Sequence, residues 1–488
     1  MSARRPRTNE AWLRQARPGR WPFLFAEIAL YDLVVLAATG IYLAVFFNPS
    51  MTRVIYHGSY GPLRGVPVSQ AYDSALHISL DMPGGLLIRQ VHQWAAVIFV
   101  AAVCLQVLQL FFTGGFRRPR RLHWLIWVAL LPLGMVEGWT GSILPDDMLS
   151  GGSLSLLQAV LQSIPVVGTH LMLLVFGGAV PGHLIIPRFY WLHFLVLPPV
   201  MIGLLLLARR PARLTGLIRQ PRSLRQPGSL SPPGSGWRGF GWRGLVRRGP
   251  GWRGLVQNPA VATSLALFFA TCGVLTMLGT FAQIDPIWSI GPYQPGATTS
   301  GAVPDWYMGF LDGGLRIMPG WEVMIAGHPL TLAVLVPALI VPGAFFTLLA
   351  AYPLLESWLT GDHGVHLLPD RPRDAVTRTA IGVAGMTFYG VLWAAAANDQ
   401  LAYHFHLDLF TVTWAFRVAV FGGPVLAFAL TRWICLSLRG REREEVEHGQ
   451  ESGRIVMSPD GGFSEIIEPV PRPRQPADPP VVTSRLDR

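Results

Sequence analysis

The stretch that decides the fold class is GGLLIRQVHQWAAVIFVAAVCLQVLQLFF, residues 84–112. From residue 93 to residue 112 it carries no acidic or basic side chain, and about 20 apolar residues are enough for a helix to cross the hydrocarbon core of a bilayer. Arg89 and His92 lie at its beginning. Residues 188–208 repeat the pattern with Arg188 and His193. The sequence therefore predicts membrane-spanning helices with ionisable groups near one end.

The composition extends this prediction to the whole chain. Hydrophobic residues make up 51% of the 488 residues and charged residues only 14%, which is too little charge to cover a water-soluble protein of this length. We predict an all-α, polytopic membrane protein with eight spans, at residues 24–47, 92–112, 122–144, 188–208, 260–281, 329–351, 377–397 and 410–436. The apolar run at 164–180 is interrupted by glycines and predicts a surface-lying or re-entrant segment.

The arginines predict the orientation of the spans. The chain has a net charge of +11, and all its basic charges are arginine. They cluster in alternate connections, at residues 4–20, 117–121, 209–253, 371–378 and 432–443. Positive loops face the cytoplasm, so both termini are expected there, in a multi-pass protein of the bacterial cell membrane. Because the charge follows topology, it does not indicate nucleic-acid binding.

The predicted organisation has five parts. They are a basic leader (1–21), an N-terminal four-helix haem-binding bundle (22–208), a cytoplasmic linker (209–258), a C-terminal four-helix half with an outer loop (259–438) and a partly disordered tail (439–488). The linker contains three GWRG repeats, typical either of a headgroup-layer segment or of low-complexity expansion. The three cysteines stand alone, so any haem is expected to be held non-covalently.

The two histidines form a candidate haem site. His92 and His193 are expected near the outer ends of their helices, and two imidazoles from different helices are the usual ligands of a six-coordinate haem b in a bundle. Arg89 and Arg188 are candidates to pair with haem propionates. The alternative is that each histidine only bonds to a neighbouring side chain, but ionisable groups inside membranes are usually functional.

A second haem would need a further histidine about four helical turns along each helix. Gln106 stands at that position on the first helix, and Leu207 or Ala208 on the second. An amide is a poor iron ligand and the two alkyl side chains cannot ligate at all. The sequence therefore predicts one haem b, on the outer side. His123 is interpreted as marking a membrane boundary.

The loop between the fifth and sixth spans is a candidate catalytic site. It contains PDWYMGFLDGGLRIMPGWE at 304–322, and Asp305 among aromatic residues suits a general base that takes a proton from a ring-shaped, amphipathic substrate. The alternative is that Asp305 only caps a short helix; both roles are compatible. A second outer segment, GWTGSILPDDMLSGG at 138–152, is expected close to this loop.

These residues resemble the cytochrome b subunit of the cytochrome bc1 complex in its actinobacterial, menaquinol-oxidising form. The resemblance covers nearly the whole chain, including WPFLFAEIALY (21–31), GSYGPLRGV (58–66), RTAIGVAGMTFYGVLW (378–393) and SGRIVMSPDG (452–461). PDWY at 304–307 is similar to the family's quinol-oxidation motif PEWY.

The resemblance implies a subunit that oxidises menaquinol at an outer site. One electron passes to a Rieske iron–sulfur subunit, whose complex includes a cytochrome c subunit, and the other passes to an outer, low-potential haem. His92 and His193 then match the outer-haem ligands, and Asp305 and Tyr307 match the quinol site. The inner-haem positions, Gln106 with Leu207 or Ala208, depart from the family pattern, which indicates a divergent paralogue.

Two functions compete. The first is a redox subunit that oxidises menaquinol and holds the outer haem; the second is a non-catalytic scaffold or assembly partner that kept the fold, paired either with itself or with an intact paralogue. Retention of both histidines and of PDWY favours the first, and loss of the inner ligands favours the second. A transporter is a weak third alternative, because no paired inverted repeats are recognisable.

Overall fold

The chain is described here from a computed structural model. It describes residues 21–209, 259–296, 304–325, 328–366, 369–457, 459, 461 and 463–468. The basic leader, the GWRG repeats and the end of the tail lie outside these residues.

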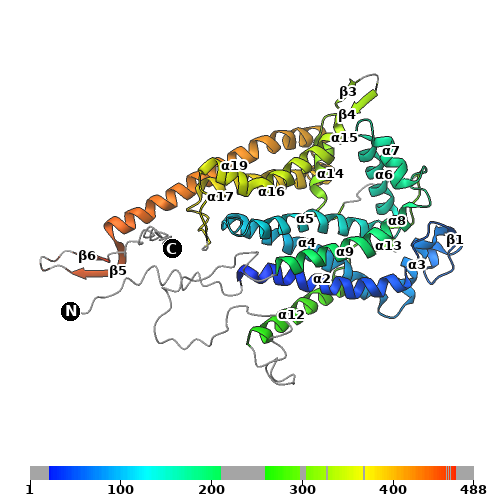
Figure 1. The fold of residues 1–488 in the computed structure, drawn as a ribbon, viewed down its shortest axis with the longest axis horizontal. Coiled ribbons are helices and arrows are strands. Elements are labelled where there is room, and N and C mark those ends of the chain that lie inside the picture. The colour runs from blue at the N-terminus through cyan, green and yellow to red at the C-terminus, as the bar shows by residue number, and fades with distance from the viewer. Residues whose placement is uncertain are drawn as a thin grey trace, which may run out of the picture.

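The described residues form a bundle of long helices lying side by side (Figure 1). The N-terminal bundle consists of α2 (Trp21–Phe46), α4 (Gly85–Phe112), α5 (Arg121–Ser142) and a span that runs through α8 (Ile185–Trp191), a π-helical turn, η3 (Leu192–Val196), and α9 (Leu197–Ala208). The C-terminal half consists of α12 (Pro259–Phe281), a span through α15 (Leu332–Leu335), η5 (Val336–Ile340) and α16 (Val341–Thr360), then α17 (Val376–Ala395) and α19 (Leu409–His448).

The structure supports seven spans, or the predicted eight when one bent helix pair is counted as a span. Seven helices of the described residues are long and apolar enough to cross a membrane. The eighth span is α17 together with α18 (Asn398–His404), which are bent by 63° at a short break. The predicted segment at 164–180 contains α7 (Gly168–Phe176), whose nine residues are too few to cross a bilayer.

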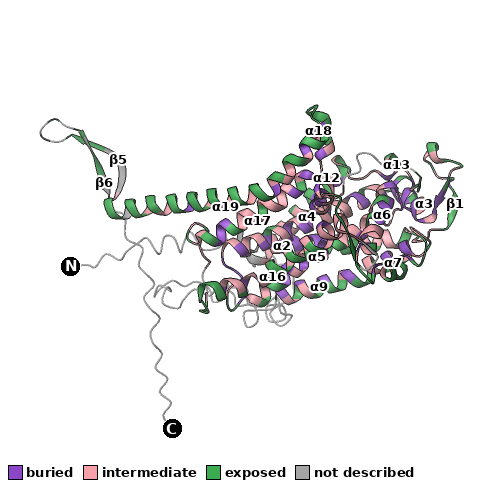
Figure 2. Cartoon of the chain, turned by 90° about the horizontal axis from the view of Figure 1, so that it is seen from above, coloured by how far each residue is buried: buried purple, intermediate pink, exposed green. Residues whose placement is uncertain are grey.

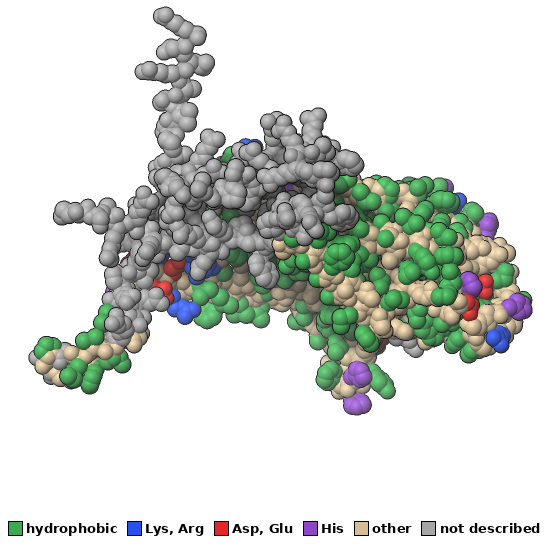
Figure 3. All heavy atoms as spheres, turned by 90° about the horizontal axis from the view of Figure 1, so that it is seen from below, with side chains coloured by type: hydrophobic (Ala, Val, Ile, Leu, Met, Phe, Trp, Pro, Cys, Tyr) green, Lys and Arg blue, Asp and Glu red, His purple; other side chains and the backbone are tan. Residues whose placement is uncertain are grey.

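Apolar side chains are arranged as in a membrane protein. Large side chains such as Phe269, Met277 and Phe421 are more than 60% exposed on the outer faces of their helices. On the face in Figure 3, apolar side chains cover most of the described surface and charged ones gather at its ends. Buried residues are purple on the ribbon in Figure 2, and Trp124 and Trp127 of α5 are among the fully buried members of the main core.

Shorter elements cover the end of the bundle that holds the predicted outer loops (Figure 1). They are β1 (Arg53–Ile55), η1 (Gly61–Leu63), β2 (Pro67–Ser69), α3 (Gln70–Leu76), η2 (His77–Asp81), α6 (Met148–Gln162), α7, α13 (Ile287–Ile290), α14 (Gly309–Ile317), β3 (Glu322–Ile325) and β4 (His328–Thr331). β1 pairs with β2, and β3 with β4, each antiparallel. These elements cover the helix ends where the candidate site lies.

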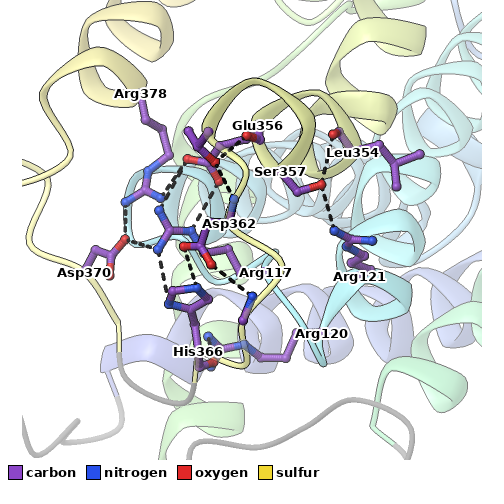
Figure 4. Close-up of polar contacts among 12 residues, drawn as sticks. Arg117, Arg120, Arg121, Leu354, Glu356, Ser357, Asp362, His366, Asp370 and Arg378 are labelled. Carbon is purple, nitrogen blue, oxygen red and sulfur yellow. Dashed lines mark hydrogen bonds and ion pairs between the residues drawn. The ribbon is translucent and has the colours of Figure 1, made fainter. Parts of the chain in front are cut away.

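At the opposite end of the bundle, ion pairs connect the N-terminal bundle to the C-terminal half (Figure 4). Arg117, after α4, pairs with Glu356 at 3.2 Å and with Asp370 at 3.0 Å. Arg378, at the start of α17, pairs with the same two acids at 3.2 and 2.6 Å. Two arginine-rich segments that the sequence assigned to one side of the membrane therefore meet at one end of the bundle.

The last helix continues past the predicted end of the eighth span. α19 has 40 residues, about 60 Å of helix, which is twice the ~30 Å thickness of the hydrocarbon core. The predicted start of the tail, residue 439, lies inside this helix, because the following arginines and glutamates allow i to i+4 ion pairs. Beyond the helix, β5 (Gln450–Met457) and β6 (Phe463–Glu468) form an antiparallel hairpin (Figure 2).

Candidate functional site

His92 of α4 and His193 of η3 face each other between their helices. Their ring centroids are 6.3 Å apart and the ring planes make an angle of 74°. Two metal–nitrogen bonds of about 2 Å each, extended by the radius of each imidazole, require ring centroids roughly 6 Å apart. The pair therefore has the separation that a single metal ion between two imidazoles needs.

The Nδ1 atom of each ring is already bonded to the protein. Nδ1 of His92 lies 2.8 Å from the hydroxyl of Thr39 on α2. Nδ1 of His193 lies 3.0 Å from the backbone carbonyl of Glu137 and 3.2 Å from the hydroxyl of Thr140, both on α5. Histidines that bind metal through Nε2 are held through Nδ1 in this way, because the bond fixes the tautomer and the ring orientation.

Two glycines make room for the rings. A β-carbon on Gly141 would lie 2.7 Å from Cε1 of His193, and one on Gly40 would lie 3.2 Å from Cε1 of His92. Each glycine directly follows the threonine that bonds the same ring, Thr39 or Thr140. Each Thr-Gly pair thus supplies both a hydrogen-bonding partner and close approach for one imidazole.

The histidines line a cavity of about 550 Å³ that also reaches the predicted catalytic loop. Arg89, Asp305 and Tyr307 line the same cavity. Arg89 is 7% exposed; its Nη2 donates to the carbonyl of Asp285 at 3.1 Å, and its Nη1 has no hydrogen-bond partner among the described residues. A buried guanidinium with a free donor suits an anionic group of a ligand.

Arg188 departs from the expectation. It is exposed, and its Nη1 donates to the backbone carbonyls of Leu174 and Val175 near the end of α7. It is not among the residues that line the cavity. The loop between α7 and α8 folds back, so that the end of α7 comes within reach of this side chain.

Asp305 and Tyr307 form a hydrogen-bonded pair. The Tyr307 hydroxyl donates to Oδ2 of Asp305 at 2.6 Å, and Tyr307 is only 1% exposed. Burial raises the pKa of Asp305 above its usual value, and the bond from Tyr307 partly opposes this. α14 begins at Gly309 with Met308 as its N-cap and no side-chain cap, so the capping role considered for Asp305 is absent from this helix.

The predicted proximity of the second outer segment is confirmed. Asp147 forms a β-bridge with Pro292, and the backbone N–H of Tyr293 donates to the carbonyl of Asp146 at 3.1 Å. Within that segment, the hydroxyl of Tyr307 lies against Gly138 of α5, in the space of a β-carbon. One turn of α5 therefore contacts both the loop at 304–322 and His193.

Two kinds of residue in this site were not predicted from the sequence. Thr39, Glu137 and Thr140 hold the imidazoles but belong to no motif that singled them out. Asp285 lines the cavity, and burial first, then the charge of Asp305, raises its pKa to about 6. The available signals were an acid inside an apolar run (Glu137) and the IDP step before the outer loop (Asp285).

The positions of a second haem are occupied differently. Gln106 is 3% exposed, and its Oε1 has no hydrogen-bond partner among the described residues. Ala208 is buried and Leu207 packs against the core. Trp127, which is 2% exposed, donates its indole N–H to Nε2 of His123 at 3.1 Å. His123 therefore has a packing role in the core besides lying at a span end.

The two supporting glycines also lack counterparts there. Fourteen residues separate His92 from Gln106 and His193 from Leu207. The same step toward the other end of the bundle leads from Gly141 to Trp127 and from Gly40 to Ala26. We call the two histidines and two glycines, His92, His193, Gly40 and Gly141, the outer socket. All four are replaced at the equivalent inner positions, where the side chain of Trp127 fills space that a glycine would leave open.

Comparisons with known proteins agree on one family. Residues 97–292 match a family model described as cytochrome b (N-terminal)/b6/petB. The chain is 43% identical over 467 residues to a cytochrome bc1 complex cytochrome b subunit of Streptomyces coelicolor, covering 94% of this chain and 81% of that one. It is 42% identical over 461 residues to the subunit of the same name from Mycobacterium tuberculosis, with 94% and 79% covered.

A solved structure supports the fold. A chain of a hyperthermophilic respiratory Complex III superposes with a TM-score of 0.57 at 17% sequence identity, covering 88% of this chain and 97% of that one. At this level of identity the superposition shows that the architecture is shared.

Proposed function

Because the chain belongs to the family of cytochrome b subunits of cytochrome bc1 complexes, we propose that it oxidises menaquinol in the outer cavity and holds one haem b between His92 and His193. As a multi-pass membrane subunit of such a complex, it is proposed to lie in the bacterial cell membrane with both termini in the cytoplasm.

The observation that carries the proposal is the shared cavity. The two histidines, Asp305 and Tyr307 line one space of about 550 Å³, which is within the usual range for small-molecule sites. A quinol gives up protons and electrons together, so its proton acceptor and its electron acceptor must lie within reach of one substrate. This cavity brings the candidates for both together.

Each residue has a proposed task. His92 and His193 would ligate the haem iron through Nε2 while their Nδ1 atoms stay bonded to the protein. Haem b, when bound, supplies a reversible one-electron acceptor. Arg89 offers its free Nη1 to an anionic group of a cavity ligand.

The catalytic loop has the task of proton transfer. Asp305 would accept the proton of the quinol hydroxyl, because burial raises its pKa toward the range in which a carboxylate is an effective base. Tyr307 holds the carboxylate in place through their 2.6 Å bond.

The residues present do not fit the second, inner haem that the family resemblance implies. Two imidazoles are replaced by Gln106 and Leu207, and Trp127 is buried where the pattern of the outer socket has a glycine. We therefore propose one haem per chain and assign no electron-transfer step to the inner half. The proposed partners are a Rieske iron–sulfur subunit, a cytochrome c subunit and a second cytochrome b chain, either identical or an intact paralogue.

The loss of the inner ligands also favours the scaffold alternative. Two measurements on the purified chain distinguish the redox subunit from the scaffold: the haem-to-protein ratio and the reduced-minus-oxidised spectrum. A haem b spectrum with menaquinol-dependent reduction supports the redox subunit. A chain that binds no haem but assembles with partner subunits supports the scaffold.

A further inference from the structure

Glu137 lies beside one of the two proposed iron ligands. Its Oε1 is 3.3 Å from Nδ1 of His193, and the two side chains are only 15% and 18% exposed. Its backbone carbonyl accepts from the same Nδ1 at 3.0 Å. Glu137 therefore places two oxygen atoms beside Nδ1 of His193, its backbone carbonyl oxygen and the carboxyl oxygen Oε1.

The other ligand has no such partner among the described residues. Nδ1 of His92 is bonded at 2.8 Å to the hydroxyl of Thr39, whose own proton is directed to the carbonyl of Val35 at 2.7 Å. A neutral hydroxyl therefore supports His92, whereas a carboxyl group lies beside His193. Each histidine has its own Thr-Gly pair, but in the described part of the chain only His193 has a carboxyl group, that of Glu137, beside its Nδ1 atom.

The remaining carboxyl oxygen has no evident structural use. Oε2 of Glu137 is buried and makes no hydrogen bond within the part of the chain that the structure describes. Leaving a buried polar atom unpaired costs free energy, and an acid inside a membrane span is costly in any case. Glu137 is also one of the residues that line the cavity assigned to the haem and the quinol.

We propose that Glu137 is a positioning residue that strengthens His193 as an iron ligand and thereby lowers the reduction potential of the outer haem. The inference rests on the proposed ligation by His92 and His193. A carboxylate beside the outer nitrogen of a metal-bound imidazole raises the basicity of that ligand. A more basic ligand and a nearby negative charge both stabilise the ferric state over the ferrous state, so the potential falls.

The test uses the full chain purified with its partner subunits and a redox titration followed by haem absorbance. Glu137→Gln keeps the size of the side chain and removes its charge. We expect the haem to remain bound and the ferric–ferrous equilibrium to shift at least tenfold toward ferrous, which is about 59 mV for a one-electron couple. The g values of the low-spin ferric haem in electron paramagnetic resonance should move as the ligand becomes less basic.

Two controls separate charge from packing. Thr140→Val removes a neutral hydroxyl from the same nitrogen, and Thr39→Val removes the one on the His92 side. Both should shift the potential much less than Glu137→Gln. Glu137→Asp keeps the charge at a greater distance and should retain most of the low potential, so it provides a second test if the glutamine variant folds poorly.

An unchanged potential in a haem-loaded Glu137→Gln variant would overturn the inference while leaving the proposed ligands intact. A Glu137→Asp variant whose potential rises by the full tenfold equivalent, although its charge is kept, would overturn it as well. If the unmodified chain shows no bis-histidine haem b spectrum, the proposed function itself fails.

Discussion

The hydroxyl group of Tyr307 lies against the α-carbon of Gly138, in the space where any other residue would place its β-carbon. Tyr307 belongs to the loop between the fifth and sixth spans, and Gly138 to the end of α5. One residue before this glycine lies Glu137, and two residues after it lies Thr140, both of which contact His193. The turn of α5 from Glu137 to Gly141 therefore joins the proposed quinol site to the proposed haem site.

Gly138→Ala should displace Tyr307 and weaken its bond to Asp305. We expect menaquinol oxidation to fall by at least tenfold while haem content stays constant, because the new methyl group clashes with Tyr307 rather than with either histidine. Steady-state assays with haem quantification measure both. Gly385→Ala of α17 is the matched control, since a β-carbon there meets no atom within 4 Å. Equal activity of the two variants would contradict the proposed packing role.

His92→Ala and His193→Ala should each abolish the low-spin haem b spectrum, because bis-imidazole ligation needs both rings. The spectra of membranes and of purified chain provide the measurement. His123→Ala is the comparison, since this half-buried histidine accepts from Trp127 and is not proposed as a ligand. An unchanged spectrum in either ligand variant would show that the assignment is wrong.

Asp305→Asn should lower turnover by roughly 10²-fold or more, the usual scale for a positioned base, with haem content intact. The carboxyl group accepts a proton only when it is ionised, so the rate should rise with pH through its pKa. Burial raises this pKa, which places the rise at higher pH than for a free aspartate.

Tyr307→Phe should move the same rise to still higher pH. The hydroxyl of Tyr307 lowers the pKa of Asp305, and its removal leaves burial unopposed. The pH–rate profiles of the unmodified chain and of both variants measure this. A profile that does not change in Tyr307→Phe would mean that another group controls the rise.

Pyridine haemochrome assay should give one haem b per chain. The double substitution Gln106→His with Leu207→His should leave this number unchanged, because Trp127 still fills the inner space. Adding Trp127→Gly and Ala26→Gly supplies all four elements of the outer socket, and only this variant is expected to gain a second haem. Two haems in the unmodified chain would refute the reading of the inner half.

Reporter fusions should test the orientation. A fusion after residue 300 should report the outer side, and one after residue 230 the cytoplasmic side, because the arginine-rich connections alternate along the chain. The charged cluster of Arg117, Arg378, Glu356 and Asp370 should then lie on the cytoplasmic side. A reversed result at either position would contradict the topology.

Sequence patterns alone were enough to predict the approximate ends of the spans, the proximity of His92 and His193, and the absence of histidine at the two inner positions. These features follow from local composition, since about 20 apolar residues make a span wherever they occur and a histidine in such a span needs a partner. The long-range resemblance of the chain to cytochrome b subunits added the role of the loop at 304–322. The end of α19 was missed, because a charged helix that leaves the membrane has no apolar signal.

Which side chains contact one another follows from the packing of the helices in three dimensions. Arg89 and Arg188 occupy similar positions before the two histidines, yet only Arg89 lines the cavity, because the carbonyls near the end of α7 hold Arg188. Glu137, Gly138 and Thr140 acquire their roles only when α5 packs between η3 and the outer loop. Trp127 acquires its role only when its indole is buried in the inner half of the bundle. Such contacts join residues tens to hundreds of positions apart, and their partners are set by packing rather than by local sequence.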